Sequence, residues 1–306
     1  MKNIKKDLNL NESICSTVNE GMHTMKKIII AVIGIIVFAI VVYFGLPPLL
    51  KTLGLHAPYE GQSFDLTGRK ALIITTSKGF LGETGKKTGV YASEMTVPYY
   101  EFFDAGMQVD IASINGGEIP IEPMSLNWPL LTPADERFLM DADFQQKVKN
   151  SLKIDQVDFT RYDLVYMAGG WGAAYDLGTS EVLGRKISEA YSSKIILGSV
   201  CHGALGFLLA KDEHGNPLVK NRKMTAVTDK QIKELGIGIT PQHPERELRA
   251  AGAIFEAKTA FLDMFANHVV IDDTIVTGQN QNAGAETAQK MMDLLKKKKS
   301  VPAVGK

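Results

Sequence analysis

The sequence predicts an α/β protein with a parallel sheet sandwiched by helices and preceded by one transmembrane helix. Segments of near-continuous apolar residues alternate with helical patterns, which is typical of parallel sheets covered on both faces. The strand Lys194–Val200 runs directly into Cys201-His202-Gly203 and then into a helical pattern, like a nucleophile elbow with sulfur in place of a serine oxygen. The run from Ile28 to Leu46 is uncharged and has the ~20-residue length that crosses a bilayer.

The N-terminal part divides into a tail (1–27), a membrane helix (28–46) and a linker (47–68) rich in proline and glycine. Lys26 and Lys27 precede the apolar run, which predicts a cytoplasmic N-terminus and a domain outside the cytoplasmic membrane. A cleaved signal peptide is the alternative, but no small-x-small cleavage site follows Leu46. Residues 1–24 are either a cytoplasmic tail or lie before the true start codon.

The folded domain is predicted over residues 69–295 as a flavodoxin-like arrangement of alternating elements. The expected strands are Lys70–Thr76, Gln108–Ile114, Tyr162–Ala168 and Lys194–Val200, and the expected helices are Ser93–Met107, Asp135–Asn150 and Ser180–Ser192. A hairpin or paired strands at His268–Thr277, a helix from about Gly284 to Leu295 and a solvated, disordered basic tail (296–306) complete the chain. Because sites in parallel sheets lie at the carboxyl ends of the strands, the loops after Thr76, Ala168 and Val200 should converge.

Cys201 is the leading candidate for a nucleophile. At the first turn of a helix, free backbone N–H groups and the helix dipole favour an anion and would lower a cysteine pKa from about 8.5 toward ~4–7. The alternative is a buried cysteine that packs as a small hydrophobe. The other cysteine, Cys15, lies in the polar N-terminal stretch, so the sequence excludes a disulfide framework and a cysteine-rich zinc site.

Charge and motif patterns exclude several other classes of function. The chain has 34 basic and 34 acidic residues, and this balance does not indicate a nucleic-acid partner. His214, His243 and His268 are scattered without metal-ligand spacing, so we expect no metal. No Walker-type phosphate loop is present, and we expect no cofactor.

An ordered set of short segments carries a family resemblance across residues 70–295. The segments are Thr84–Tyr91, Ser93-Glu94 with Pro98-Tyr99, Asp163–Gly170 with Gly172 and Tyr175–Leu177, Val200–Gly203, His268–Val270 and Thr277–Asn280. In this order they resemble the ThiJ/PfpI superfamily, whose fold is similar to that of class I glutamine amidotransferases. The likeness is greatest to the branch of glutathione-independent glyoxalases and heat-inducible chaperones.

The resemblance implies a role for each member of the site. Cys201 would be the nucleophile, Glu94 the buried glutamate beside it, and His202 a second catalytic residue that relays protons. Burial and a neighbouring anion would raise the pKa of Glu94, so that it can share a proton with the thiol and move protons on the substrate. Gly170 and Trp171 would supply backbone N–H groups for an anion hole, and Gly203 would lie at the pocket.

Two positions depart from the family pattern. Trp171 stands where the family often has a histidine, so the pocket should be narrower and more apolar. The acidic partner of the catalytic histidine falls three residues after a Thr-Asp pair such as Thr228-Asp229, and here that position is Ile232. Asp229 or Glu234 would have to substitute, which leaves a complete Cys-His-acid triad open.

The function that follows is a cysteine-dependent enzyme acting on small reactive carbonyls. It would convert 2-oxoaldehydes such as methylglyoxal to 2-hydroxy acids without glutathione. The enzymatic alternatives are a cysteine peptidase or amidase and a protein deglycase. The non-catalytic alternatives are a membrane-tethered chaperone and a redox sensor, since an exposed low-pKa thiol oxidises readily. The expected partners are the aldehyde and the bilayer, through residues 28–46, and the sequence leaves a homodimer open.

Overall fold

The computed structural model describes residues 2–300, with side chains for residues 21–298. The chain divides into two units, Met1–Leu50 and Lys51–Lys306. Helix α1 spans Lys2–Thr52. Its part Gly21–Thr52 is long and apolar enough to cross a membrane, a criterion of length and composition that a signal sequence also meets.

Helix α1 extends beyond both ends of the predicted membrane segment. It includes Pro47 and Pro48, so the first residues of the predicted linker are helical rather than irregular. Further along this linker, Leu55 and Leu66 are buried in the folded unit, and the N–H of His56 donates to Asn282 Oδ1 at 2.7 Å. At the other end, the backbone of the predicted tail is helical from Lys2, whereas the side chain of Cys15 lies outside the described residues.

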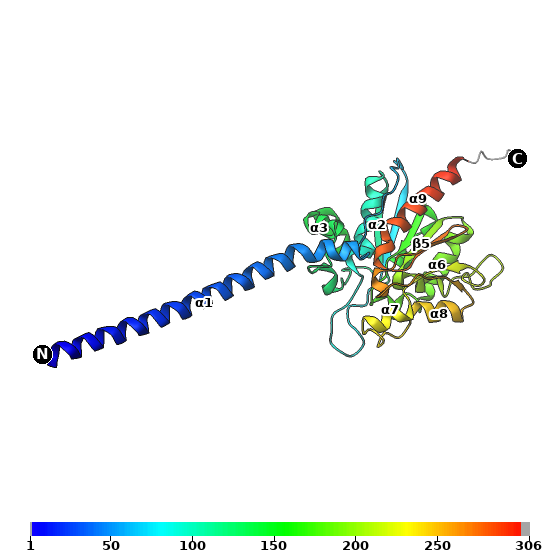
Figure 1. Ribbon diagram of the computed structural model, residues 1–306. Coiled ribbons are helices and arrows are strands. Elements are labelled where there is room, and N and C mark those ends of the chain that lie inside the picture. Colours follow the sequence, from blue (N-terminus) through cyan, green and yellow to red (C-terminus); the bar gives the residue numbers. More distant parts are fainter. Residues whose placement is uncertain (1, 301–306) are drawn as a thin grey trace. The chain divides into compact units, whose positions relative to one another are not determined.

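The folded unit is built on a seven-stranded, mostly parallel sheet, as the sequence predicts (Figure 1). The strand order is β3-β2-β1-β4-β5-β9-β8, and only the pair β8–β9 is antiparallel. The strands are β1 Lys70–Thr75, β2 Gln108–Ser113, β3 Leu152–Lys153, β4 Leu164–Met167, β5 Ile196–Val200, β8 Val269–Asp272 and β9 Ile275–Gly278. Two short strands, β6 (Lys223–Met224) and β7 (Ile254–Phe255), pair in a second sheet. The β8–β9 hairpin confirms the pairing expected at residues 268–277.

Both faces of the sheet are buried, which explains why its strands lack polar alternation. In β1, Ile73 pairs with Tyr166 of β4, and both belong to one hydrophobic core. The neighbouring pair Leu72 and Val165 points to the opposite face and belongs to a second core. The sheet therefore holds the ends of β1, β4 and β5 between two packed layers.

The helices cover these two faces. Helices α2 (Ala92–Asp104) and α9 (Gly284–Ser300) pack side by side against the first core (Figure 1), and α6 (Glu181–Ser192) packs against the second. The shorter helices are α3 Pro133–Met140, α4 Ala142–Lys149, α5 Ala173–Asp176, α7 Asp229–Glu234 and α8 Pro244–Ala250. The 3₁₀-helices are η1 Pro123–Leu126, η2 Ile154–Gln156, η3 Phe159–Arg161, η4 Cys201–Phe207, η5 Asp263–Phe265 and η6 Gln281–Ala283.

Two sequence predictions are corrected here. The single helix expected at Asp135–Asn150 is wrong, because the chain breaks at Asp141, whose Oδ1 accepts the N–H of Phe144 at 3.0 Å and so caps α4. The basic tail expected from residue 296 begins as helix, since α9 continues to Ser300. The rest of that tail, residues 301–306, lies outside the described residues.

Candidate active site

The chain turns sharply where β5 ends. Cys201 has φ 55°, in the left-handed region that costs a residue with a side chain on the order of 1–3 kcal/mol. This strained turn lies between strand and helix, where the sequence predicts the elbow. The helix that follows is the 3₁₀-helix η4 rather than the expected α-helix. The helix-dipole argument for a lowered thiol pKa is correspondingly weak.

Two glycines let the backbone approach closely around the elbow. A Cβ on Gly203 would lie 2.2 Å from the carbonyl oxygen of Met167, so η4 packs directly on the end of β4. Gly203 does not line the cavity around Cys201 that is described below, in contrast to the pocket position expected for it. Gly170 has φ 102°, and a Cβ there would lie 2.3 Å from the backbone N of Tyr91. Gly170 does line the cavity.

Cys201 opens into a small, mostly apolar cavity of about 50 Å³. This volume corresponds to roughly four water-sized positions, so it suits a molecule of a few heavy atoms. Of the residues predicted for the site, the cavity brings together Glu94, Gly170, Trp171, Cys201 and His202. The other lining residues are Tyr91, Met124, Leu130, Val227, Gln231, Leu235, Met264 and Gln281. Among the residues whose side chains are described, no lysine or arginine lines it, which disfavours a strongly anionic ligand.

Glu94 is a buried carboxyl in the first turn of α2. Burial raises its pKa to about 8, while hydrogen bonding to the Cys201 thiol and to the backbone of Gly169 limits the rise. Its Oε2 is buried and has no hydrogen-bond partner among the described residues. At neutral pH this side chain is therefore mostly protonated and can act as a proton donor.

The Cys201 thiol is buried against this carboxyl. Burial, and next the charge that Glu94 carries when ionised, raise the pKa of Cys201 well above its usual value. The backbone N–H groups of His202 and Gly170 act in the opposite direction by donating toward the sulfur. The expectation of a thiol pKa lowered by a helix terminus is thus corrected: the pair Glu94–Cys201 holds its protons tightly. The N–H groups directed at the sulfur are thus those of His202 and Gly170, whereas the anion hole predicted at Gly170 and Trp171 stays a prediction.

His202 is fully buried next to the thiol, with Nδ1 3.4 Å from Cys201 Sγ. Burial, with a smaller contribution from His243, lowers the pKa of His202 to about 3. The ring is therefore neutral at physiological pH. Its Nε2 is buried and has no hydrogen-bond partner among the described residues. A neutral imidazole can accept a proton at one nitrogen and donate one from the other.

The structure does not bring Asp229 to His202. Asp229 begins α7 and faces His243 at 3.6 Å and Arg246 at 3.8 Å. Ile232 is buried in the first core, and Glu234 accepts the backbone N–H of Asp263. Among the described residues no hydrogen bond or ion pair joins His202 to a carboxylate, so the arrangement is a Cys-His pair with a separate glutamate.

Several wall residues were not predicted from the sequence. Tyr91 is the N-cap residue of α2, three residues before Glu94, and its backbone is extended, so helical spacing does not identify it. Burial, and next the charge that Glu94 carries when ionised, raise the pKa of Tyr91 above its usual value, so its phenol stays protonated at neutral pH. Gln231 and Gln281 face the cavity and bond to each other at 3.3 Å. No sequence signal distinguishes them from surface amides.

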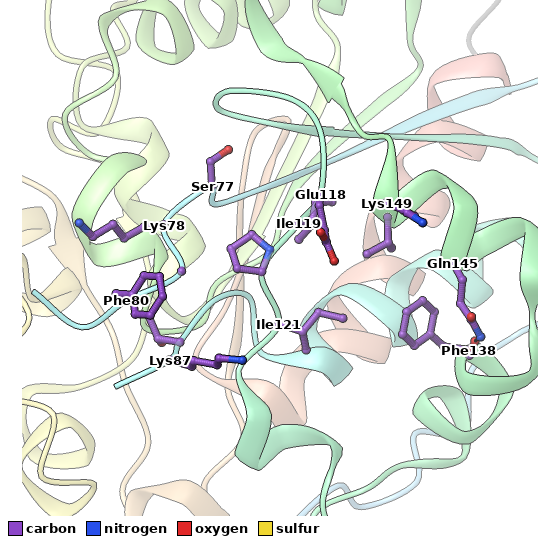
Figure 2. A pocket seen from close by; sticks show the side chains of 14 residues that line it. Ser77, Lys78, Phe80, Lys87, Glu118, Ile119, Ile121, Phe138, Gln145 and Lys149 are labelled. Carbon is purple, nitrogen blue, oxygen red and sulfur yellow. Dashed lines mark hydrogen bonds between the residues drawn. The ribbon is translucent and has the colours of Figure 1, made fainter. Parts of the chain in front are cut away.

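A much larger cavity, of about 840 Å³, lies elsewhere in the folded unit (Figure 2). The loop after β1 lines it with Phe80 and Lys87, and Ile121, Phe138 and Gln145 line it further along. In the part of the chain whose side chains are described, neither a cysteine nor a histidine lines it. Size alone would select this cavity, but the chemistry selects the small one around Cys201.

A family model described as the DJ-1/PfpI family matches residues 87–294, about two-thirds of the chain. The chain belongs to the DJ-1/PfpI family. The match covers Glu94, Cys201 and His202, and it confirms the family resemblance found in the sequence. The membership also accounts for the α/β architecture around the elbow.

The chain matches relatives in this family over nearly the whole length of each relative. The glutathione-independent glyoxalase hsp3102 of Schizosaccharomyces pombe is 29% identical over 238 residues, covering 74% of this chain and 98% of the relative. Glyoxalase 3 of Candida albicans is 27% identical over 225 residues, with 71% and 94% covered. The crystal structure of glyoxalase III from Candida albicans matches with a TM-score of 0.67 at 26% identity, covering 74% of this chain and 96% of that one. The Rapid Encystment Protein of Francisella tularensis matches with a TM-score of 0.69 at 29% identity, covering 74% and 99%.

Proposed function

We propose that the chain is a glutathione-independent glyoxalase that converts a 2-oxoaldehyde and water to a 2-hydroxy acid. The observation that carries this proposal is the meeting of a strained thiol, a protonated carboxyl and a neutral imidazole in one small cavity. The similarity to glyoxalases over most of the domain supports it. The reaction balances with substrate and water alone.

In the first step, the Cys201 sulfur adds to the aldehyde carbon and forms a hemithioacetal. The thiol proton passes to the aldehyde oxygen by way of the ionised form of Glu94 or of neutral His202, whose Nδ1 is 3.4 Å from the sulfur. Backbone N–H groups of His202 and Gly170 lower the cost of negative charge at this point. The strained turn at Cys201 exposes the sulfur to the substrate carbon.

In the second step, a proton moves from the former aldehyde carbon to the neighbouring carbonyl carbon through an enediol. This transfer oxidises the first carbon and reduces the second, and it leaves a thioester on Cys201. Glu94 suits the shuttle, because a carboxyl with a pKa of about 8 gives and takes protons near neutral pH. Water then hydrolyses the thioester, releasing the 2-hydroxy acid and the thiol.

The size of the cavity favours this reaction over peptide or amide hydrolysis. A cavity of about 50 Å³ accepts a few heavy atoms, whereas a peptidase has to hold an extended chain across its nucleophile. In a hydrolase triad a carboxylate orients the histidine base and stabilises its charged form. Among the described residues His202 has no such partner, which also disfavours hydrolysis of peptides or amides.

The proposal is tested by incubating the purified full-length chain with methylglyoxal in the absence of glutathione and other small thiols. We expect lactate to form in proportion to aldehyde consumed. Consumption of methylglyoxal without lactate would identify simple modification of the protein, and no consumption would refute the proposed activity.

The activity should depend on pH through the Glu94–Cys201 pair. Below about pH 8 the pair keeps both protons, since the pKa of Glu94 is about 8 and that of Cys201 is also raised. Attack requires the loss of one of these protons, so kcat/KM should rise about tenfold per pH unit below the pKa. The measurement is kcat/KM with methylglyoxal from pH 6 to pH 9, with enzyme stability checked at each pH. A flat profile between pH 6 and pH 8 would contradict this assignment.

We also propose that α1 anchors the chain in the cytoplasmic membrane, with the folded domain on the outer side. The length and composition of Gly21–Thr52 and the lysine pair Lys26-Lys27 support this topology. Protease added to intact cells or spheroplasts should degrade the domain while a cytoplasmic marker stays intact. Full protection of the domain in sealed cells would place it in the cytoplasm. A shortened chain free of the membrane would instead identify a cleaved signal peptide.

A further inference from the structure

One wall of the catalytic cavity is formed by two segments that are joined mainly by polar contacts. Helix α7 and the residue after it contribute Gln231 and Leu235. Residues 257–266, here named the Met264 loop, contribute Met264. At the tip of this loop the ring of Phe261 is 90% exposed and does not anchor the loop to the domain. The contacts between the Met264 loop and α7 therefore help to determine the shape of the cavity.

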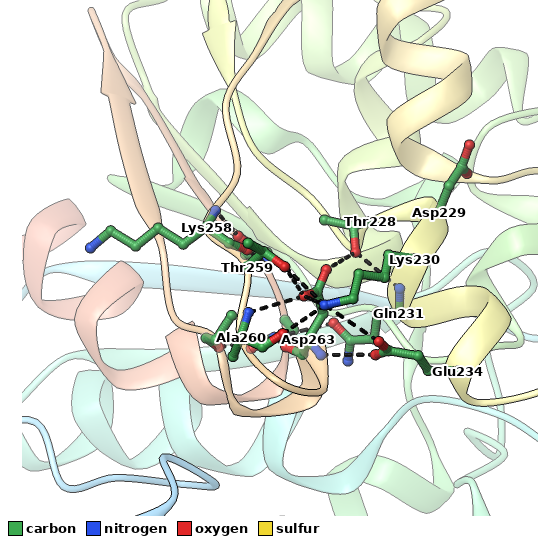
Figure 3. A network of polar contacts seen from close by, with 12 residues as sticks. Thr228, Asp229, Lys230, Gln231, Glu234, Lys258, Thr259, Ala260 and Asp263 are labelled. Carbon is green, nitrogen blue, oxygen red and sulfur yellow. Dashed lines mark hydrogen bonds and ion pairs between the residues drawn. The ribbon is translucent and has the colours of Figure 1, made fainter.

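Asp263 is the centre of this contact (Figure 3). Its side chain is almost fully buried and accepts hydrogen bonds from Thr228 Oγ1 at 2.7 Å, Thr259 Oγ1 at 2.7 Å and the N–H of Ala260 at 3.2 Å. Thr228 is the cap of α7, whereas Thr259 and Ala260 belong to the Met264 loop. One carboxylate thus ties both segments together.

Lys230 supplies the opposite charge from α7. Its Nζ lies 2.8 Å from Asp263 Oδ1 and also donates to Thr259 Oγ1 at 2.9 Å and to the carbonyl oxygen of Ala260 at 2.6 Å. Glu234 completes the cluster by accepting the N–H of Asp263 at 2.8 Å. Figure 3 shows these contacts converging from α7 and the loop on the same point. Because the Asp263 carboxylate is buried, loss of the half-exposed Lys230 cation should weaken the contact between α7 and the loop.

The other side of the Met264 loop has a separate attachment. The carbonyl oxygen of Met264 accepts from Asn282 Nδ2 at 2.7 Å and from Gln281 Nε2 at 3.2 Å. Weakening the Lys230–Asp263 contact should therefore loosen the contact between the loop and α7 without detaching the loop from the domain. Local opening of this kind needs less free energy than global unfolding.

We propose that the Lys230–Asp263 pair determines how large a molecule can reach Cys201, by holding the Met264 loop against α7 as a wall of the cavity. The pair acts through the position of Met264 and does not touch the substrate. The identification of that molecule as an aldehyde rests on the proposed function, whereas the effect on access to the thiol does not.

The test compares the access of two reagents to Cys201 in the full-length chain carrying Cys15→Ser. N-Methylmaleimide and N-pyrenylmaleimide share one reactive group and carry no charge, but they differ greatly in size. Lys230→Met removes the cation from a side chain that is 44% exposed and should leave the fold intact. We expect it to raise the rate with the large reagent, relative to the small one, by about tenfold or more. Asp263→Asn should act in the same direction.

Lys258→Met is the matched control. Lys258 lies on the same loop, and Figure 3 shows its ammonium pointing away from the cluster. An unchanged ratio in a folded Lys230→Met variant, or an equal increase in Lys258→Met, would overturn the proposal. If Asp263→Asn does not fold, Lys230→Met decides alone.

A kinetic comparison separates this inference from the proposed function. If the chain is a glyoxalase, Lys230→Met should lower KM for phenylglyoxal relative to methylglyoxal and leave kcat for methylglyoxal within about twofold. A change in the maleimide ratio without any glyoxalase activity in the wild type would support the size-selecting wall and refute the proposed reaction. A lowered kcat for methylglyoxal with an unchanged maleimide ratio would indicate a merely structural role and contradict the inference.

Discussion

Replacing Cys201 with alanine should reduce lactate formation from methylglyoxal by on the order of 10³-fold or more, because it removes the nucleophile that carries the substrate. The side chain is buried in a tight, strained turn, and alanine fills the space of its Cβ without overlap. We therefore expect the loss in kcat to occur without unfolding. The measurement is lactate released per enzyme, with the fold monitored by circular dichroism.

Cys15→Ser is the matched control for this experiment, since it removes the only other cysteine from a part of the chain distant in sequence from the domain. It should retain wild-type activity. Activity that survives Cys201→Ala, or disappears in Cys15→Ser, would remove Cys201 from the mechanism.

Replacing Glu94 with glutamine should lower kcat by about 10²–10⁴-fold while making the folded protein more stable. The pKa of Glu94 is raised from about 4.5 to about 8, so folding takes up a proton between these values and the folded state loses stability as pH rises through them. At pH 7 this cost is roughly 3 kcal/mol at ~1.36 kcal/mol per pKa unit. Glutamine is neutral at every pH, so the substitution removes this cost in folding free energy.

The two effects of Glu94→Gln are measured on one preparation, as lactate formation and as thermal unfolding at pH 6 and pH 8. The gain in melting temperature should be larger at pH 8, where the wild-type carboxyl has lost more stability. Lower stability of the variant at both pH values would contradict a buried, protonated carboxyl. Unchanged kcat would exclude Glu94 as the proton shuttle.

The parallel sheet and the elbow could be predicted because local pattern determines them. Apolar strands such as Ile196–Val200 have to be covered on both faces, and the step from strand to helix at Cys201 is visible in the sequence itself. The break at Asp141 could not be predicted, because an aspartate can occupy either the interior or the cap of a helix. Only the hydrogen bond from the N–H of Phe144 to its side chain identifies it as a cap. The close packing of η4 on β4 joins residues that are far apart in sequence, so a local pattern does not predict it.

The sequence predicts which residues form the site but not the protonation state of each. The order of motifs placed Glu94, Cys201 and His202 together, whereas the protonation of each depends on burial that no pattern reveals. Burial raises the pKa of both Glu94 and Cys201 and lowers that of His202, and this outcome reverses the expected low-pKa thiol. Asp229 faces His243 because α7 and α8 meet there, a contact that sequence spacing does not predict.

Trapping the covalent intermediate tests the central claim most directly. The full-length chain, mixed with methylglyoxal and quenched with acid within one turnover, should yield a peptide containing Cys201 that has gained the mass of one substrate molecule. The adduct should disappear as lactate appears, and it should accumulate in Glu94→Gln if the carboxyl moves the proton. Lactate formation at the wild-type rate with no adduct on Cys201 at any time would contradict the account.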